Sequence, residues 1–198
     1  VGYKQKVVCT NPCGEQPLAP YSVCNLAAIN LANMVDRDKA EVDWVKLERT
    51  IRVAIRMQDN VIDKTHYFLD ENKNQALGER RIGLGIMGLH DLLIWCNKRY
   101  GSNEANVLVE ELFKFISTNA YEESIEIAKV KGSFPFLETE ENVELFLQSG
   151  FIKKLPEYIR ESIRKNGIRN SHLLTIAPTG STGTMVGVST GLEPYFAF

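Results

Sequence analysis

Apolar residues recur at helical spacing along several stretches of this chain. Asp43 is suited to cap a helix that continues to about residue 67. Gly132 is suited to end another helix, whose last turn carries Lys129 and Lys131. The predicted helices cover about 43–67, 87–98, 103–131, a short stretch between Thr139 and Gly150, and a stretch between Pro156 and Gly167. The apolar stripes consist of Trp44, Leu47, Ile51, Ile55, Ile62, Leu89, Leu92, Leu93, Leu108, Leu112, Phe115, Ile116 and Ala120.

Short apolar runs between these helices predict strands. Val7–Cys9 is typical of a short strand, and Leu173–Ala177 of a short buried strand. Residues 81–85 are expected to form a Gly-rich strand or turn, whereas the pattern over 21–35 does not decide between strand and helix. Residues 69–78 are polar and are expected to form a loop. Strands that alternate with helices predict an α/β architecture, here as one domain over residues 1–198.

Composition removes several classes of function. The chain has 198 residues and a net charge of −2, so it lacks the basic footprint of a protein that binds nucleic acid or an anionic membrane. No apolar run approaches the roughly 18 residues of a membrane span. The four cysteines are too sparse for a disulfide scaffold, and the three histidines show no zinc-site spacing with them. We therefore expect reduced thiols, a cytoplasmic protein and no metal bound by this chain.

The stretch Asn11–Glu15 groups unusual chemistry. If it is extended, Asn11, Cys13 and Glu15 share one face, because alternate side chains of an extended chain point the same way. Pro12 and Gly14 favour a tight loop over a helix. A thiol, an amide and a proton acceptor would then meet at a loop tip. The alternative is that Cys13 is a small buried apolar residue with no chemical role.

Two glycine-rich stretches are further candidates. Gly83–Gly88 reads G-x-G-x-x-G, the dinucleotide fingerprint, which would suggest a nicotinamide-dependent oxidoreductase. That fingerprint needs an acidic residue after a second strand about 20 residues on, whereas the chain near Glu104 opens a helix. Close packing of a strand on a helix explains these glycines better. Ala177–Thr184 combines glycines with hydroxyl groups and suits either a phosphate cradle or an ordinary turn.

Cys13 and Cys24 lie eleven residues apart and form a possible redox pair. Two thiols brought together across a loop can cycle between dithiol and disulfide. The residues alone favour two unrelated core cysteines.

Taken together, these segments resemble the large catalytic subunit of ribonucleotide reductase, and most closely its class II, adenosylcobalamin-dependent form. The resemblance extends over essentially the whole chain, and the motif that begins at Asn11 is highly specific. The segments that carry it are Asn11–Leu18, Pro20–Leu26, Arg80–Gly88, Ile176–Ser181 and Ser189–Pro194.

The resemblance implies the second half of a ten-stranded α/β barrel with a central finger loop. It implies that Cys13 becomes a thiyl radical that abstracts the 3′ hydrogen of a ribonucleotide, and that Glu15 takes the 3′-hydroxyl proton. Asn11 would orient the substrate and Glu15, and Cys24 would belong to the dithiol that supplies electrons. The matching substrate-phosphate loop consists of Pro178, Thr179, Gly180, Ser181 and Thr182.

The resemblance also implies partners outside this chain. These are adenosylcobalamin, an N-terminal barrel half that carries the second redox cysteine, and a thioredoxin-like reductant. Neither Cys9 nor Cys96 matches that second cysteine. Two alternatives remain at this stage: a class I reductase that uses a separate radical-generating subunit, and a non-catalytic fragment that serves assembly.

Overall fold

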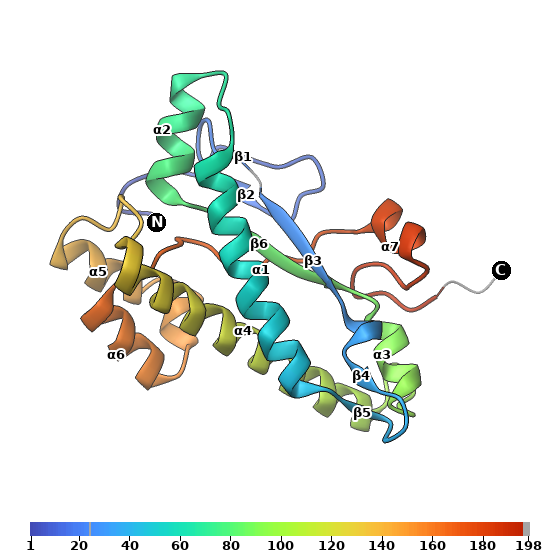
Figure 1. The fold of residues 1–198 in the computed structure, drawn as a ribbon. Coiled ribbons are helices and arrows are strands. Elements are labelled where there is room, and N and C mark those ends of the chain that lie inside the picture. Colours follow the sequence, from blue (N-terminus) through green and yellow to red (C-terminus); the bar gives the residue numbers. More distant parts are fainter. Residues whose placement is uncertain (24, 196–198) are drawn as a thin grey trace.

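Two parallel strands and the helices between them form the centre of the fold (Figure 1). Strand β3 (Leu26–Asn30) pairs in parallel with β6 (Gly83–Met87), with Leu26 opposite Gly83 and Asn30 opposite Met87. The chain between them includes α1 (Trp44–Lys64) and α2 (Asp70–Glu79), as a parallel pair requires a long crossover. Within the undecided stretch 21–35, residues 26–30 are therefore a strand, and a 3-10 turn follows at residues 31–33.

The computed structural model describes residues 1–23 and 25–195. The remaining helices are α3 (Leu89–Trp95), α4 (Asn103–Lys131), α5 (Glu140–Leu147), α6 (Glu157–Asn166) and α7 (Gly180–Val186), with single 3-10 turns at Leu31–Asn33 and Ile152–Lys154. The short strands are β1 (Cys9–Thr10), β2 (Pro17–Leu18), β4 (Val35–Asp36) and β5 (Glu41–Val42).

The segment 173–177 lies beside β6 but forms less strand than its sequence predicts. Leu84 and Leu174 form an isolated parallel bridge, in which Leu84 N donates to Leu173 O at 2.7 Å and Thr175 N donates to Leu84 O at 3.0 Å. The paired strands in the described part of the chain form two-stranded sheets, and no sheet closes. The structure thus supports a mixed helix and strand fold, and the ten-stranded barrel stays a prediction.

The predicted caps of the long helices are confirmed. The Asp43 carboxylate accepts a hydrogen bond from Lys46 N at 2.9 Å, so it caps α1. Gly132 ends α4 with a φ of 81°, a conformation that favours glycine. The two helices cross and bury their apolar stripes against each other and the strand pair (Figure 1).

The predicted loop over residues 69–78 is wrong, because α2 occupies almost all of it. α2 has little apolar periodicity, since only Ala76, Gly78 and Glu79 are buried. Its side chains instead form hydrogen bonds to the N-terminal segment, as from Gln75 to Ser22 at 3.2 Å. Polar tertiary contacts therefore hold a helix that hydrophobic spacing does not reveal.

Several predicted ends also differ from the structure. α1 and α3 are shorter than predicted, and Pro156 precedes the first residue of α6 instead of occupying it. Val7 and Val8 are exposed and lie ahead of β1. Helix ends fray, and apolar spacing alone does not fix the terminal residue.

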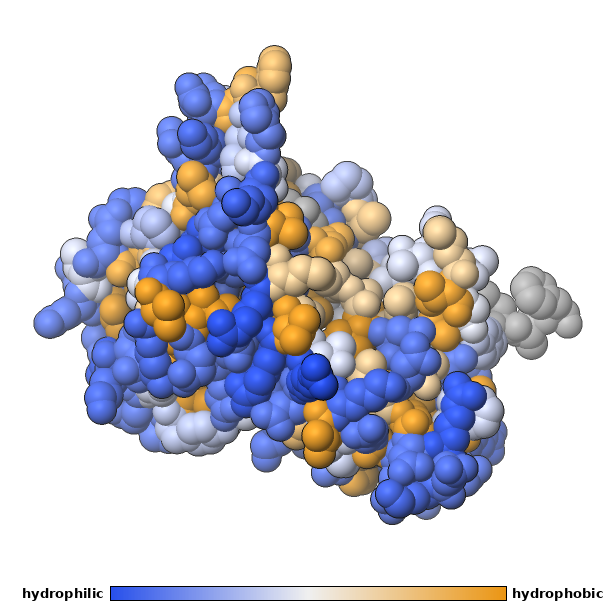
Figure 2. Space-filling view, viewed as in Figure 1, coloured by the Kyte–Doolittle hydropathy of each residue, from blue (hydrophilic) through white to orange (hydrophobic). Residues whose placement is uncertain are grey.

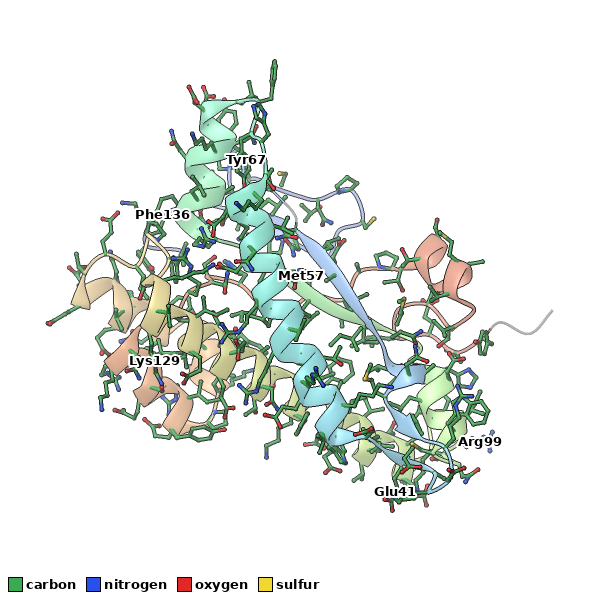
Figure 3. All side chains as sticks on the ribbon, viewed as in Figure 1. Glu41, Met57, Tyr67, Arg99, Lys129 and Phe136 are labelled. Atoms are coloured by element: carbon green, nitrogen blue, oxygen red, sulfur yellow. The ribbon has the colours of Figure 1, made fainter. Side chains whose placement is uncertain are left out.

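The exposed flank of α1 carries a second apolar stripe, made of Val53, Met57 and Val61 (Figure 2). Met57 is labelled on this helix in Figure 3. In the described residues, no helix combines the length and apolar character needed to cross a membrane. α1 therefore carries an exposed apolar surface in addition to the apolar stripe that it buries in the core.

We expect Gly85→Ala to destabilise the fold by roughly 2–3 kcal/mol, the range of an overpacked core. A Cβ atom at Gly85 would lie 2.4 Å from the main-chain oxygen of Thr175, a residue that is bound to β6 because its main-chain N donates to Leu84 O at 3.0 Å. Urea unfolding of the variant measures the effect. Gly150→Ala is the control, because nothing lies within 4 Å of its Cβ position, and equal stability of both variants would contradict the close approach.

Candidate functional site

The stretch expected to carry the chemistry is the tip of a small hairpin, residues 9–18, in which β1 pairs antiparallel with β2. Asn11 closes the turn: its main-chain N donates to Gln16 O at 3.1 Å, and its Oδ1 accepts from Gln16 N at 2.9 Å. Gly14 has a φ of 82°. Residues 11–16 therefore form a turn and are not extended, so the alternation argued from the sequence does not hold here.

Cys13 and Glu15 nevertheless face one cavity of about 470 Å³. Its walls come from the hairpin tip, from β3, which follows the hairpin closely in the sequence, and from a distant segment, residues 177–182. Residues 178–182, named here the 178–182 turn, comprise Pro178, Thr179 and the first turn of α7. The residues that line the cavity are Cys13, Glu15, Leu26, Ala27, Ala28, Ala177, Pro178, Thr179, Gly180, Ser181 and Thr182. All five residues expected to form the phosphate loop thus share this cavity with the thiol and the carboxylate.

The two reactive groups differ in exposure. Cys13 is an exposed free thiol, which excludes the alternative of a buried apolar cysteine. Both carboxylate oxygens of Glu15 are buried, and neither has a hydrogen-bond partner among the described residues. A buried carboxylate without a partner is costly, which makes Glu15 a candidate functional group.

Asn11 is buried but is not among the residues that line the cavity. Its amide oxygen accepts from the main chain of the turn that carries Cys13 and Glu15. In the described contacts Asn11 therefore shapes the turn, and its orientation of a substrate stays a prediction.

The 178–182 turn is strained at Thr179, the residue that precedes α7. Thr179 adopts a φ of 50°, a left-handed conformation that is uncommon for a β-branched residue. Its Oγ1 accepts a hydrogen bond from Gly191 N at 2.8 Å, and Gly183 N donates to its main-chain oxygen at 2.7 Å. Ser181 and Thr182 are exposed at the cavity, so their hydroxyl groups can donate to a ligand.

The hairpin is held directly over β6. Thr175 Oγ1 donates to the main-chain oxygen of Glu15 at 3.0 Å. Gln16 packs on Gly83, where a Cβ atom would lie 2.3 Å from the Gln16 amide nitrogen. Glycine at position 83 thus lets the hairpin approach the strand.

A fully buried carboxylate holds both ends of the hairpin. Glu79 accepts from Ser22 Oγ at 2.7 Å and from Gln5 Nε2 at 2.9 Å. Gln5 precedes β1 and Ser22 follows β2, while Arg81 Nε lies 3.3 Å from the same carboxylate. Nothing in the hydrophobic pattern identifies Glu79, since an acidic residue at the end of a polar helix normally faces solvent.

We expect the stability of the chain to fall as the pH drops below about 6.5 because of His172. Burial, followed by the charge of Arg81, lowers the pKa of His172 well below 6.5. The unfolded state therefore binds the proton at a higher pH than the folded state does. The free energy of unfolding should then fall by at most about 1.4 kcal/mol per pH unit from this group.

Urea unfolding at pH 7.5 and 5.5 tests this expectation. His172→Gln should reduce the pH dependence, and the control His66→Gln, at an exposed position, should retain it. An unchanged slope in His172→Gln would contradict the assignment.

The structure does not test every residue of the predicted site. Cys24 lies outside the described residues, so its pairing stays a prediction. Cys9 and Cys96 are free, the first exposed and the second buried. Sequence reasoning missed the cavity wall formed by Leu26, Ala27 and Ala28, for which the adjacent small alanines were the available signal.

The glycine run does not form a dinucleotide turn. Gly83 and Gly85 lie inside β6, and only Gly88, with a φ of 73°, occupies the turn into α3. The prediction that these glycines let a strand pack closely on a helix is wrong. Gly83 and Gly85 instead give room for close contacts with Gln16 of the hairpin and with Thr175. Among the described residues, no cluster of three or more His, Cys, Asp or Glu could hold a metal ion.

The chain is similar to known proteins over nearly its whole length. The family model described as "Ribonucleotide reductase, barrel domain" matches residues 2–198. A vitamin B12-dependent ribonucleoside-diphosphate reductase of Mycobacterium tuberculosis H37Rv is 38% identical over 192 residues, which cover 97% of this chain and 24% of that protein. The enzyme of the same name from Thermoplasma acidophilum is 37% identical, with 95% of this chain and 22% of that protein covered.

A ribonucleoside-diphosphate reductase subunit alpha of Chlamydia pneumoniae is 34% identical, with 96% of this chain and 20% of that protein covered. The chain thus spans about a fifth to a quarter of the length of these relatives. With nearly all of its residues matched by the family model, the chain belongs to the ribonucleotide reductase family and comprises sequence of its barrel domain.

Proposed function

We propose that this chain is the catalytic part of a ribonucleotide reductase barrel, which reduces ribonucleotides to 2′-deoxyribonucleotides for DNA synthesis. One observation carries the proposal: the buried, unpartnered carboxylate of Glu15 shares a cavity with the exposed thiol of Cys13 and with the 178–182 turn. Reduction of a ribonucleotide needs a thiol at the 3′ hydrogen, a base at the 3′-hydroxyl group and a binding site for the phosphates. The proposed fold of the whole barrel, with this chain as a single domain of its second half, follows the family.

Each residue has a defined task in the proposed reaction. Cys13, as a thiyl radical, removes the 3′ hydrogen of the ribose, and Glu15 accepts the 3′-hydroxyl proton. A buried carboxylate without a competing partner is free to accept that proton. Asn11 keeps the turn in shape and orients the substrate, while residues 178–182 bind the phosphates through hydroxyl groups and main-chain N–H groups.

Loss of the 2′-hydroxyl group as water requires two electrons. We propose that Cys24 and a cysteine from the other barrel half supply them and form a disulfide, which a thioredoxin-like protein then reduces. The three described cysteines are free, in keeping with a reducing compartment such as the cytoplasm.

Adenosylcobalamin is the proposed cofactor, since two of the relatives above are named as vitamin B12-dependent. When bound, it supplies the radical that oxidises the thiol. One residue of this chain is suitably placed to react with the cofactor. Cys13 is exposed where it lines the cavity, so a cofactor held by other segments can reach its thiol. This chain's own part is to present the thiol and to exclude water around Glu15.

The test is turnover by a full-length reductase that carries this chain as its barrel segment. We expect deoxyribonucleotide formation from a ribonucleoside diphosphate when adenosylcobalamin and a dithiol reductant are present. No product with either a diphosphate or a triphosphate substrate would refute the proposal. Activity that ignores cobalamin and requires a separate metal-containing subunit would assign the protein to class I.

A non-catalytic role in assembly is the remaining alternative. It predicts that the chain binds the other barrel half, yet that the assembled protein forms no deoxyribonucleotide under either set of conditions. Size-exclusion chromatography of the mixture, run together with the turnover assay, separates the two roles.

A further inference from the structure

The segment that follows α7, residues 188–195, links the cavity to a helix outside it. We name this segment the strap. It runs from the end of α7 back to the first turn of α3, on the side of β3 away from α5 and α6 (Figure 1). Its contacts at both ends are polar and specific.

Asp91 holds the strap at two points. Its Oδ2 accepts from Ser189 N at 2.8 Å, and its Oδ1 accepts from Tyr195 Oη at 2.6 Å. Burial alone would raise the pKa of Asp91, but these hydrogen bonds outweigh it and lower the pKa. The Asp91 carboxylate also raises the pKa of Tyr195 to about 12. The carboxylate is thus ionised and bonded at both oxygens near neutral pH.

Neighbours of Asp91 strengthen the same attachment. Gly88 N donates to the main-chain oxygen of Ser189 at 2.8 Å, and His90 N donates to Ser189 Oγ at 3.2 Å. Tyr195 N donates to His90 Nδ1 at 3.1 Å. Ser189 is buried, with 3% of its surface exposed, so this end of the strap is fixed in place.

The other side of the strap contacts Thr179, which lines the cavity, and Gly183 of α7. Gly191 N donates to Thr179 Oγ1 at 2.8 Å, and Val188 N donates to Gly183 O at 3.0 Å. Thr190 packs on Gly183, where a Cβ atom would lie 2.7 Å from its methyl group. Among the described residues, the only side-chain hydrogen bond of Thr179, the strained residue of the 178–182 turn, is therefore the bond to the strap.

We infer that Asp91 is a positioning residue that fixes the 178–182 turn in the cavity by anchoring the strap between Ser189 and Tyr195. This inference rests on the proposed function, in which that turn binds substrate phosphates. Asp91 does not line the cavity, so its effect on a substrate passes through Thr179.

The experiment compares Asp91→Ala with Asp70→Ala in the full-length reductase. Both aspartates lie in the first turn of a helix, but Asp70 lies in α2 and not in the strap's attachment, so it controls for loss of charge at a helix start. Asp91→Ala should raise the KM for a ribonucleoside diphosphate about tenfold and change kcat less than threefold, because hydrogen bonds to a charged group are lost. Asp70→Ala should match the wild type.

A second readout does not depend on turnover. Hydrogen–deuterium exchange of peptides that cover residues 178–195 should be faster in Asp91→Ala and unchanged in Asp70→Ala. If Asp91→Ala does not fold, Tyr195→Phe removes one of the two bonds and should give smaller changes in the same direction.

The inference is overturned if exchange over 178–187 is the same in the variant and the wild type, or if kcat falls while KM stays constant. An inactive wild type would count against the proposed function alone, since the exchange experiment still decides whether Asp91 holds the turn.

Discussion

Replacing Cys13 by serine should reduce deoxyribonucleotide formation to background, while the protein keeps its fold. An O–H bond is stronger than an S–H bond, so serine cannot take the place of a thiyl radical. Cys13 is exposed, and its replacement therefore removes no buried contact. The measurement is turnover of a ribonucleoside diphosphate by the full-length reductase, together with the urea midpoint of each variant.

Cys9→Ser is a matched control within the same hairpin. Cys9 is also exposed and free, but it is not among the residues that line the cavity. Its variant should keep wild-type turnover. Equal rates in Cys13→Ser and the wild type would remove Cys13 from the mechanism, whatever the control shows.

Replacing Glu15 by glutamine should have opposite effects on activity and stability. Turnover should fall by about two to four orders of magnitude, the contribution of a positioned general base. The free energy of unfolding should rise by about 1 kcal/mol, because an amide costs less to bury without a partner than a carboxylate. Turnover assays and urea unfolding of the same preparation measure both effects.

Glu110→Gln is the control for a change of charge, since Glu110 is exposed on α4. It should alter neither quantity. A Glu15→Gln variant that loses stability along with activity would mean that Glu15 has a structural partner, contrary to its unpartnered oxygens.

The long helices of the fold could be predicted from the sequence because each buries an apolar stripe at helical spacing. The stripe through Leu47, Ile51 and Ile55 faces the core over most of α1, and Asp43 caps it as expected. α2 could not be predicted in this way, because polar contacts from Gln75 and Glu79 to the N-terminal segment replace an apolar stripe. Such contacts depend on tertiary structure and leave no periodic signal.

The site was predictable in its residue types and only partly in its geometry. Cys13 and Glu15 meet in one cavity as expected, although a turn with Gly14 in a left-handed conformation brings them there. Asn11 closes that turn through its hydrogen bond with Gln16. The spacing of residues in the sequence does not predict this bond. Asp91 could not be found from the sequence, since it lies almost a hundred residues from its partner Ser189.

The bond from Thr175 to Glu15 also sets an order of events during biosynthesis. These two residues lie at opposite ends of the chain, with a sequence separation of 160. On a translating ribosome the hairpin emerges long before Thr175 and the turn that follows it, and contacts between distant segments form late. In a nascent chain the hairpin with Cys13 and Glu15 therefore stays without the 178–182 turn, and the cavity closes around the thiol only after residues 175–182 have been made.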